Sequence, residues 1–131
     1  MTGKEYQDLA MRTNDGGCTN RLSGFANSFE EAKKHLPQDD IIIPGDLVNG
    51  VMGLNGEAGE CIDLVKKYIF HHHPLDVVEF EKELGDVMWY VAMCCNALNI
   101  SLNDVMKMNI DKLKKRYPDG FSTSASINRE D

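Results

Sequence analysis

The sequence predicts an all-α fold, a bundle of about four to five helices in one domain. Three stretches, at about residues 46–73, 76–98 and 101–117, repeat apolar residues at intervals of three and four, the period of a helix with one buried face. With 131 residues, of which 42% are hydrophobic, the chain can build one modest core and not two. We expect the domain to span residues 1–121 and a disordered polar tail to follow at 122–131.

The first part of the chain predicts shorter elements. A short helix is expected over about residues 3–12, with Thr2 as its N-cap and a narrow apolar face. Residues 13–27 are rich in Gly, Asn, Ser and Thr, which favours a loop. A second short helix is expected over 29–36, and residues 37–44 are expected to be irregular.

Local sequence signals bound the three longer helices. The first starts at a Pro-Gly-Asp sequence, with Asp46 as the N-cap, and ends in three histidines before Pro74. Asp76 opens a D-x-x-E capping box that starts the second helix. Ser101 caps the third helix, which stops at a Pro-Asp-Gly sequence.

Two pairs of acidic residues stand out on the first two of these helices. They are Glu57-Ala-Gly-Glu60 and Glu83-Leu-Gly-Asp86. Residues three positions apart lie on one face of a helix, roughly 4.5 Å apart along its axis. If the two helices lie side by side, four carboxylates therefore point into one space.

A hard divalent cation would relieve the repulsion within such a cluster. Clustered carboxylates raise each other's pKa values, whereas Mg²⁺ takes oxygen ligands and commonly binds phosphate oxygens as well, with Mn²⁺ as a substitute. Each pair contains a glycine, Gly59 or Gly85, although glycine costs about 1 kcal/mol relative to alanine in a helix. These glycines suggest room for something to approach. With 21 Asp and Glu residues in the chain, a solvated acidic face is the alternative.

Charge and composition limit the partners. A net charge of -7 argues against a nucleic-acid polymer, because binding to a phosphate backbone needs clustered Lys and Arg. A phosphorylated small molecule is still compatible if metal ions mediate the contact. No stretch approaches the roughly 20 apolar residues of a membrane span, and the four cysteines lack a C-x-x-C spacing. We expect a cytoplasmic protein with reduced cysteines and no membrane partner.

The acidic motifs and a third block together resemble a known family. The third block follows the two acidic pairs and contains Asn109, Lys112 and the sequence Arg-Tyr-Pro-Asp-Gly-Phe at 116–121. The chain resembles the MazG-type all-α nucleoside triphosphate pyrophosphohydrolases, relatives of the dimeric dUTPases and of phosphoribosyl-ATP pyrophosphohydrolase. This resemblance covers about residues 46–121, and the residues before it match less well.

The resemblance implies roles for individual residues. The ligands of Mg²⁺ would be Glu57, Glu60, Glu83 and Asp86. The residues at the phosphates or sugar would be Asn109, Lys112, Arg116 and Lys66. The catalytic residues would be Glu57, Glu60 and Lys112: one glutamate of the Glu57/Glu60 pair would hold the attacking water, and Lys112 would neutralise charge on the phosphate chain. Asp63 would support the ligands.

The resemblance also implies an assembly and a reaction. The family completes its helical bundle by dimerisation, so we expect the core to be completed in a homodimer or a dimer-of-dimers tetramer. The expected reaction is Mg²⁺-dependent hydrolysis of a (deoxy)nucleoside triphosphate to the monophosphate and pyrophosphate, in house-cleaning of the nucleotide pool. The base and the sugar stay open.

Two other classes of protein compete with this interpretation. A non-catalytic acidic bundle, used for interaction or for binding a metal such as Ca²⁺, has the same composition. A di-iron carboxylate bundle requires E-x-x-H on two helices, and no histidine stands three residues after any of these glutamates.

Overall fold

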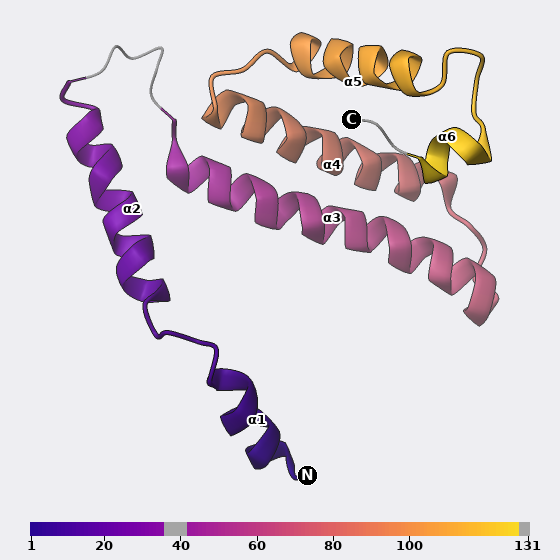
Figure 1. Ribbon diagram of the computed structural model, residues 1–131. Helices are drawn as coiled ribbons and strands as arrows, with labels where there is room; N and C mark the ends of the chain where they lie inside the picture. Colours follow the sequence, from indigo (N-terminus) through magenta and orange to yellow (C-terminus); the bar gives the residue numbers. More distant parts are fainter. Residues whose placement is uncertain (36–41, 129–131) are drawn as a thin grey trace.

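The computed structural model describes residues 1–35 and 42–128, and within these ranges it contains six α-helices and no strand (Figure 1). The all-α prediction is therefore confirmed. In chain order the helices are α1 (Gly3–Met11), α2 (Cys18–Ala32), α3 (Pro44–His71), α4 (Val77–Ala97), α5 (Leu102–Arg116) and α6 (Thr123–Ile127).

The two longest helices, α3 and α4, form an antiparallel pair that carries most of the tertiary packing (Figure 1). Ile43, just before α3, donates its backbone N–H to the carbonyl oxygen of Ala97 at the end of α4, at 2.8 Å. Among the described residues, Gly50, Cys95 and Ala97 are buried, all near this end of the pair. The core of a single chain is therefore small and is confined to the region between α3 and α4.

Two glycines allow α3 and α4 to approach closely. A Cβ atom added at Gly53 would lie 2.1 Å from Cε1 of Tyr90, and one added at Gly50 would lie 2.7 Å from Sγ of Cys94. Real Cβ atoms do not make contacts this short, so these positions accept glycine alone without a shift of the neighbour. Packing of this density is normal for a protein interior, where a single added methyl group is felt.

The N-terminal helices extend away from this pair (Figure 1). α2 touches α3 near the start of α3, where Phe25 and Val48 line a shallow apolar groove. The prediction of a loop at residues 13–27 holds for 13–17 and is wrong from Cys18 onward, where α2 starts. Leu22, Phe25 and Phe29 recur at helical intervals there, and the weak helix propensities of Ser, Asn and Thr do not outweigh that pattern. The helix predicted over 29–36 is the last part of α2, which ends at Ala32 and is followed by a turn at 33–35. Residue 36 and most of the stretch predicted to be irregular lie outside the described residues.

The predicted helix starts are confirmed in part. Thr2 caps α1 in a complete capping box with Glu5, and Asp76 caps α4 by accepting from the N–H of Glu79 at 3.0 Å. Ser101 occupies the N-cap position of α5 but makes no side-chain cap. The prediction of Asp46 as the N-cap of α3 is wrong, because Pro44 is already helical and places Asp46 in the first turn, where a carboxylate favours the helix dipole.

Much of the expected apolar surface is uncovered in a single chain. On α3, Leu54 and Ala58 are half-buried, whereas Ile62 and Ile69 are 68% and 54% exposed. On α5, Ile110 is exposed as well. Within the tail predicted to be disordered, Thr123–Ile127 form the short helix α6, which starts where the Ser122 hydroxyl accepts from the N–H of Ala125 at 3.1 Å.

Candidate metal centre and active site

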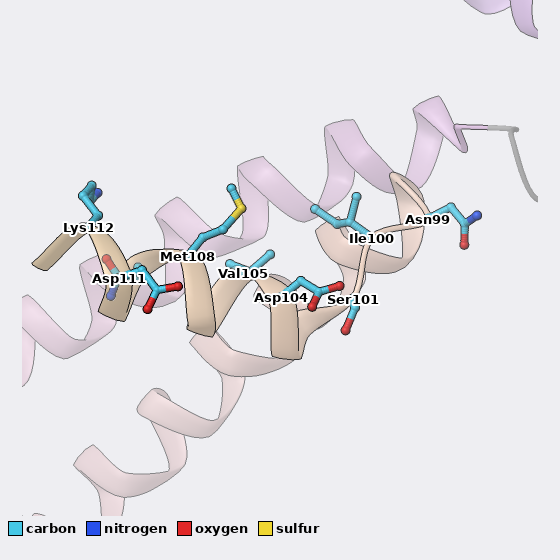
Figure 2. Close-up of a pocket in the computed structure, with 9 residues that line it drawn as sticks. Asn99, Ile100, Ser101, Asp104, Val105, Met108, Asp111 and Lys112 are labelled. Atoms are coloured by element: carbon cyan, nitrogen blue, oxygen red, sulfur yellow. The ribbon is translucent and has the colours of Figure 1, made fainter. Parts of the chain in front are cut away.

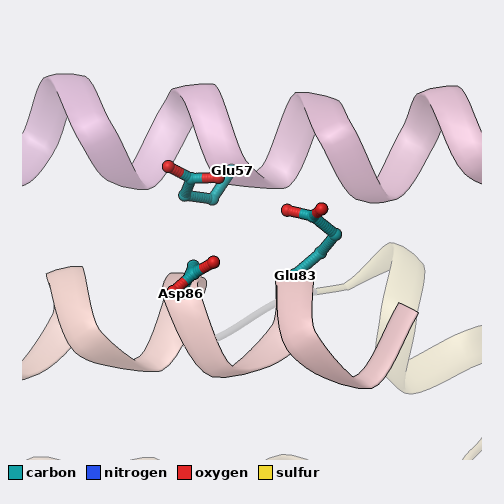
Figure 3. Close-up of side chains that lie close together, drawn as sticks. All are labelled: Glu57, Glu83 and Asp86. Atoms are coloured by element: carbon teal, nitrogen blue, oxygen red, sulfur yellow. The ribbon is translucent and has the colours of Figure 1, made fainter. Parts of the chain in front are cut away.

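Three carboxylates converge between α3 and α4. Glu57 comes from α3, and Glu83 and Asp86 come from α4 (Figure 3). One oxygen atom of each carboxylate lies within 4.8 Å of an oxygen atom of each of the others. Glu57 and Glu83 are half-buried and Asp86 is exposed, so the cluster opens to solvent on the side of Asp86. We call these three residues the acidic cluster.

The helices create the cluster through their period and their direction. Glu83 and Asp86 are three positions apart, so both project from one face of α4. α3 runs in the opposite direction beside that face, and Glu57 lies one turn beyond Gly53 on the side that meets α4. The two halves of the cluster are therefore joined only by the packing of the two helices.

Negative charge gathers in the acidic cluster without a cationic side chain beside it in the described part of the chain. The pKa of Glu83 is raised above its ordinary value, first because burial penalises the ionised carboxylate and then because of the negative charges of Glu57, Glu60, Glu79 and Asp86. In the described part of the chain no Lys, Arg or His forms an ion pair with any member of the acidic cluster. Three carboxylate oxygens at this spacing suit a hard divalent cation.

The fourth predicted ligand, Glu60, lies outside this cluster. It is exposed and is not one of the three residues whose oxygens converge, although its charge helps to raise the pKa of Glu83. The structure therefore brings together Glu57, Glu83 and Asp86 and leaves Glu60 beside them.

Lys66, predicted to contact the substrate, is paired within α3. Its Nζ lies 2.5 Å from one carboxylate oxygen of Asp63, and Nζ of Lys67 lies 2.5 Å from the other. These two ammonium groups, Lys66 first, lower the pKa of Asp63 to about 2. Asp63, predicted to support the metal ligands, is thus held by two lysines one turn beyond Glu60.

The predicted residues of α5 lie along a separate groove. Asn109 and Lys112 line an open cavity of about 1000 Å³ beneath α5 and the turn before it (Figure 2). The other residues that line it are Asn99, Ile100, Ser101, Asp104, Val105, Met108 and Asp111. Arg116 is half-buried and lines a smaller cavity with Ala125 and Asn128 of the α6 region. No member of the acidic cluster lines either cavity.

Sequence reasoning missed the glycines that matter for the packing. A Cβ atom at Gly59 or Gly85, the two glycines singled out by their place between paired acids, would meet nothing within 4 Å. The close approach to α4 occurs at Gly50 and Gly53 instead. A usable signal was present, because these residues and Glu57 follow one another at intervals of three and four on one face of the helix.

Fold and site together define a class: an all-α protein with a candidate site for a divalent cation between two antiparallel helices. The family model of the MazG nucleotide pyrophosphohydrolase domain matches residues 50–121, which include the whole acidic cluster. The chain therefore belongs to the MazG nucleotide pyrophosphohydrolase domain family. Members of this family generally depend on divalent metal ions.

The chain is also similar to a protein of a bacteriophage. The Gene 37 protein of Mycobacterium phage L5 is 38% identical over 103 residues, which cover 70% of this chain and 90% of that protein. Its name states no activity. No solved structure matches the chain significantly. None of the described helices is both long and apolar enough to cross a membrane.

Proposed function

We propose that this protein hydrolyses a (deoxy)nucleoside triphosphate to the nucleoside monophosphate and pyrophosphate, as a house-cleaning enzyme of the cytoplasmic nucleotide pool. The observation that carries the proposal is the acidic cluster: two helices of a nucleotide pyrophosphohydrolase domain bring three carboxylates together. Such a domain already indicates hydrolysis of nucleotides, and the cluster supplies a place for the cation that triphosphates normally carry.

The proposed cation is Mg²⁺, with Mn²⁺ as a substitute. Glu57, Glu83 and Asp86 would hold it, since their oxygens are hard donors and no cationic side chain of the described chain competes for them. When bound, the cation would neutralise phosphate charge and lower the pKa of the attacking water. The three carboxylates alone would repel a triphosphate, so the same residues that attract the cation keep the substrate out without it.

Glu60 fits the role of general base. It stands three positions after Glu57 on α3, close enough to affect the pKa of Glu83, yet outside the converging oxygens. Its carboxylate is therefore available to accept a proton from a water molecule beside the cation. Glu57, the other predicted catalytic acid, would act mainly by binding the cation.

The residues of α5 would bind the substrate. Lys112 would neutralise charge on the phosphate chain, Asn109 would contact phosphate or sugar, and Arg116 and Lys66 would play smaller parts. In a single chain Asn109 and Lys112 line a groove without acidic-cluster residues. We therefore propose that assembly of two copies joins this edge of α5 to an acidic cluster.

Exposed apolar side chains support a homodimer or a dimer of dimers. A groove at the far end of α3 is lined by Ile62, Val65, Ile69, Phe70 and Phe80, and the buried core of one chain is small. Leaving so much apolar surface in water is unfavourable at roughly 25 cal/mol per Å². Size-exclusion chromatography with light scattering is expected to show a dimer or a tetramer, and a monomer at micromolar concentration would reject this part.

The reaction is tested with a panel of nucleoside triphosphates and Mg²⁺ or Mn²⁺, with products separated by chromatography. We expect monophosphate and pyrophosphate in equal amounts, and no products with EDTA. Reaction in water labelled with oxygen-18 shows which phosphorus atom is attacked, because the label enters either the monophosphate or the pyrophosphate. Absence of hydrolysis across the panel would reject the proposal in favour of a non-catalytic acidic bundle.

A further inference from the structure

The glycine of α3 and α4 that a neighbouring side chain approaches most closely, Gly53, lies one helical turn from the acidic cluster. The ring of Tyr90 sits over the backbone of Gly53, so that a Cβ atom added there would lie 2.1, 2.3 and 2.5 Å from Cε1, Cζ and Cδ1 of Tyr90. This is closer than the approach at Gly50, where the nearest atom is Sγ of Cys94 at 2.7 Å. Tyr90 is half-buried, and its ring meets the indole of Trp89 edge-on with centroids 4.9 Å apart.

On both helices, the contact between Gly53 and Tyr90 lies four residues from a member of the acidic cluster. Four positions after Gly53, about one turn of α3, comes Glu57. Four positions before Tyr90, about one turn of α4, comes Asp86. Because the helices are antiparallel, these two steps lead in the same direction along the pair, toward the acidic cluster. A shift of one helix at the glycine contact is therefore passed on to the carboxylates.

Apart from Gly50 and Gly53, the glycines of the two helices have no close neighbour. A Cβ atom at Gly56, Gly59 or Gly85 would meet nothing within 4 Å. A methyl group is thus excluded at Gly53 and tolerated one turn away on the same helix. The chain itself supplies a matched control for any experiment on Gly53.

We propose that Gly53 and Tyr90 are positioning residues: the ring of Tyr90, seated on Gly53, sets the separation and register of α3 and α4 that bring Glu57 to Glu83 and Asp86 for binding of a divalent cation. This inference rests on the metal centre of the proposed function and adds the residues that build it. Metal ligands tolerate displacements of only a few tenths of an ångström, so helices pushed apart by one methyl group lose a shared cation.

The test measures binding of Mn²⁺ directly, by the electron paramagnetic resonance signal of the free ion, with no nucleotide present. For Gly53→Ala we expect binding weakened by about tenfold or more, the range found when a residue that orients a metal ligand is lost. Gly56→Ala is expected to bind within about twofold of the wild type, because its methyl group points into open space. Tyr90→Phe keeps the ring and is also expected to bind within about twofold, whereas Tyr90→Ala removes the spacer and is expected to match Gly53→Ala.

Circular dichroism of each variant separates positioning from folding. If Gly53→Ala has lost helicity, the decisive variant is Gly53→Ala with Tyr90→Leu, whose smaller side chain makes room for the methyl group. The double variant is expected to regain both helicity and at least half of the lost binding free energy. Wild-type binding of Mn²⁺ by Gly53→Ala, or failure of the double variant to recover after a folding loss, would overturn the inference.

The same Mn²⁺ measurements distinguish failure of the positioning role from failure of the proposed metal centre. If the wild type does not bind Mn²⁺, or if Glu57→Gln binds it as well as the wild type, the proposed centre is wrong and the inference is rejected with it. If the wild type binds through the acidic cluster and Gly53→Ala binds equally well, the positioning role alone is wrong.

Discussion

The α3–α4 pair and the N-terminal helices α1 and α2 use the same local signals but differ in what they bring together. α1 has a complete capping box between Thr2 and Glu5, and α4 has a cap at Asp76. Among the described helices, α3 and α4 approach closely at glycines that meet Tyr90 and Cys94, whereas α2 touches α3 sparingly and α1 lies farther out (Figure 1). Caps and periodicity determine where helices form, and glycine contacts determine which side chains meet.

The two regions also differ in how they balance charge. In the N-terminal region, Asp15 accepts two hydrogen bonds from the guanidinium of Arg21, at 2.7 and 3.0 Å, and Lys4 pairs with Asp8. In the pair of long helices, the acidic cluster has no such partner among the described residues. Uncompensated negative charge beside the contact between α3 and α4 is what the proposed cation site requires.

The largest effect is expected from breaking the cluster itself. Asp86→Asn keeps the size of the side chain but removes a charged ligand, so we expect the hydrolysis rate to fall by about a hundredfold or more, the equivalent of roughly 2.7 kcal/mol. The measurement is kcat/KM at saturating Mg²⁺. The matched control is Glu81→Gln, an exposed acid of the same helix outside the cluster, expected to stay within about twofold. Equal activity of Asp86→Asn and wild type would contradict the ligand assignment.

The next effect concerns the stability of the pair. Gly50→Ala places a methyl group 2.7 Å from Sγ of Cys94, so we expect the free energy of unfolding to fall by about 1–3 kcal/mol through overpacking. Gly59→Ala meets nothing within 4 Å and is expected to raise it by about 0.5–1 kcal/mol through helix propensity. Urea unfolding at one fixed protein concentration measures both. Stabilisation by both substitutions would show that the space between α3 and α4 at Gly50 is larger than the 2.7 Å distance indicates.

A third comparison applies one change of the same kind to both regions. Asp76→Ala removes the cap of a helix held in the α3–α4 pair, so it is expected to lower the free energy of unfolding by about 1 kcal/mol. Thr2→Ala removes an equivalent cap from α1, which fewer contacts hold, so local fraying is expected with no shift of the urea midpoint. Hydrogen exchange of the first turns locates the two effects. An equal shift of the midpoint in both variants would mean that α1 unfolds together with the pair.

Local signals explain why the long helices, and the spacing within each acidic pair, were predictable. The apolar period and the caps at Asp76 and the Pro-Gly-Asp start are properties of single segments, and they located α3, α4 and α5 within a few residues. The first part of α2, residues 18–28, was missed because its Gly, Ser and Asn content was given more weight than the spacing of Leu22 and Phe25.

The composition of the cluster was not predictable from one segment at a time. Helical spacing placed Glu57 with Glu60 and Glu83 with Asp86, but the choice of Glu57 over Glu60 as the converging residue depends on the register between two helices. That register depends in turn on the ring of Tyr90 fitting over Gly53, a tertiary contact. The place of Lys112 relative to the cluster could not be predicted from the sequence of α5 alone either, and in a single chain Lys112 lines a separate groove.

The smallest expected effect is a dependence of stability on pH, with opposite signs for Glu83 in the α3–α4 pair and Asp15 in the N-terminal region. The pKa of Glu83 is raised above its ordinary value of 4.5, first by burial and then by the neighbouring carboxylates, so its ionised form opposes folding. Stability from this group is therefore lost as the pH rises from 4.5 through the raised pKa. In metal-free protein with EDTA, Glu83→Gln is expected to raise the urea midpoint at pH 7, and the difference is expected to shrink toward pH 4.

Asp15 provides the opposite case. Its pKa is lowered from 3.8, chiefly by the hydrogen bond from Arg21, so its stabilising contribution is present above 3.8 and is lost as the pH falls through the lowered pKa. Asp15→Asn is therefore expected to lower local protection of α2 at pH 7 and to have no effect in acid. Added Mg²⁺ should stabilise the wild type more than Glu83→Gln, because a cation bound at the acidic cluster makes the ionised carboxylate of Glu83 stabilising. Asp15 lies outside the acidic cluster, so its contribution to stability is expected not to change with Mg²⁺. A midpoint at pH 7 in EDTA that is lower for Glu83→Gln than for the wild type would mean that the cluster is compensated without a metal.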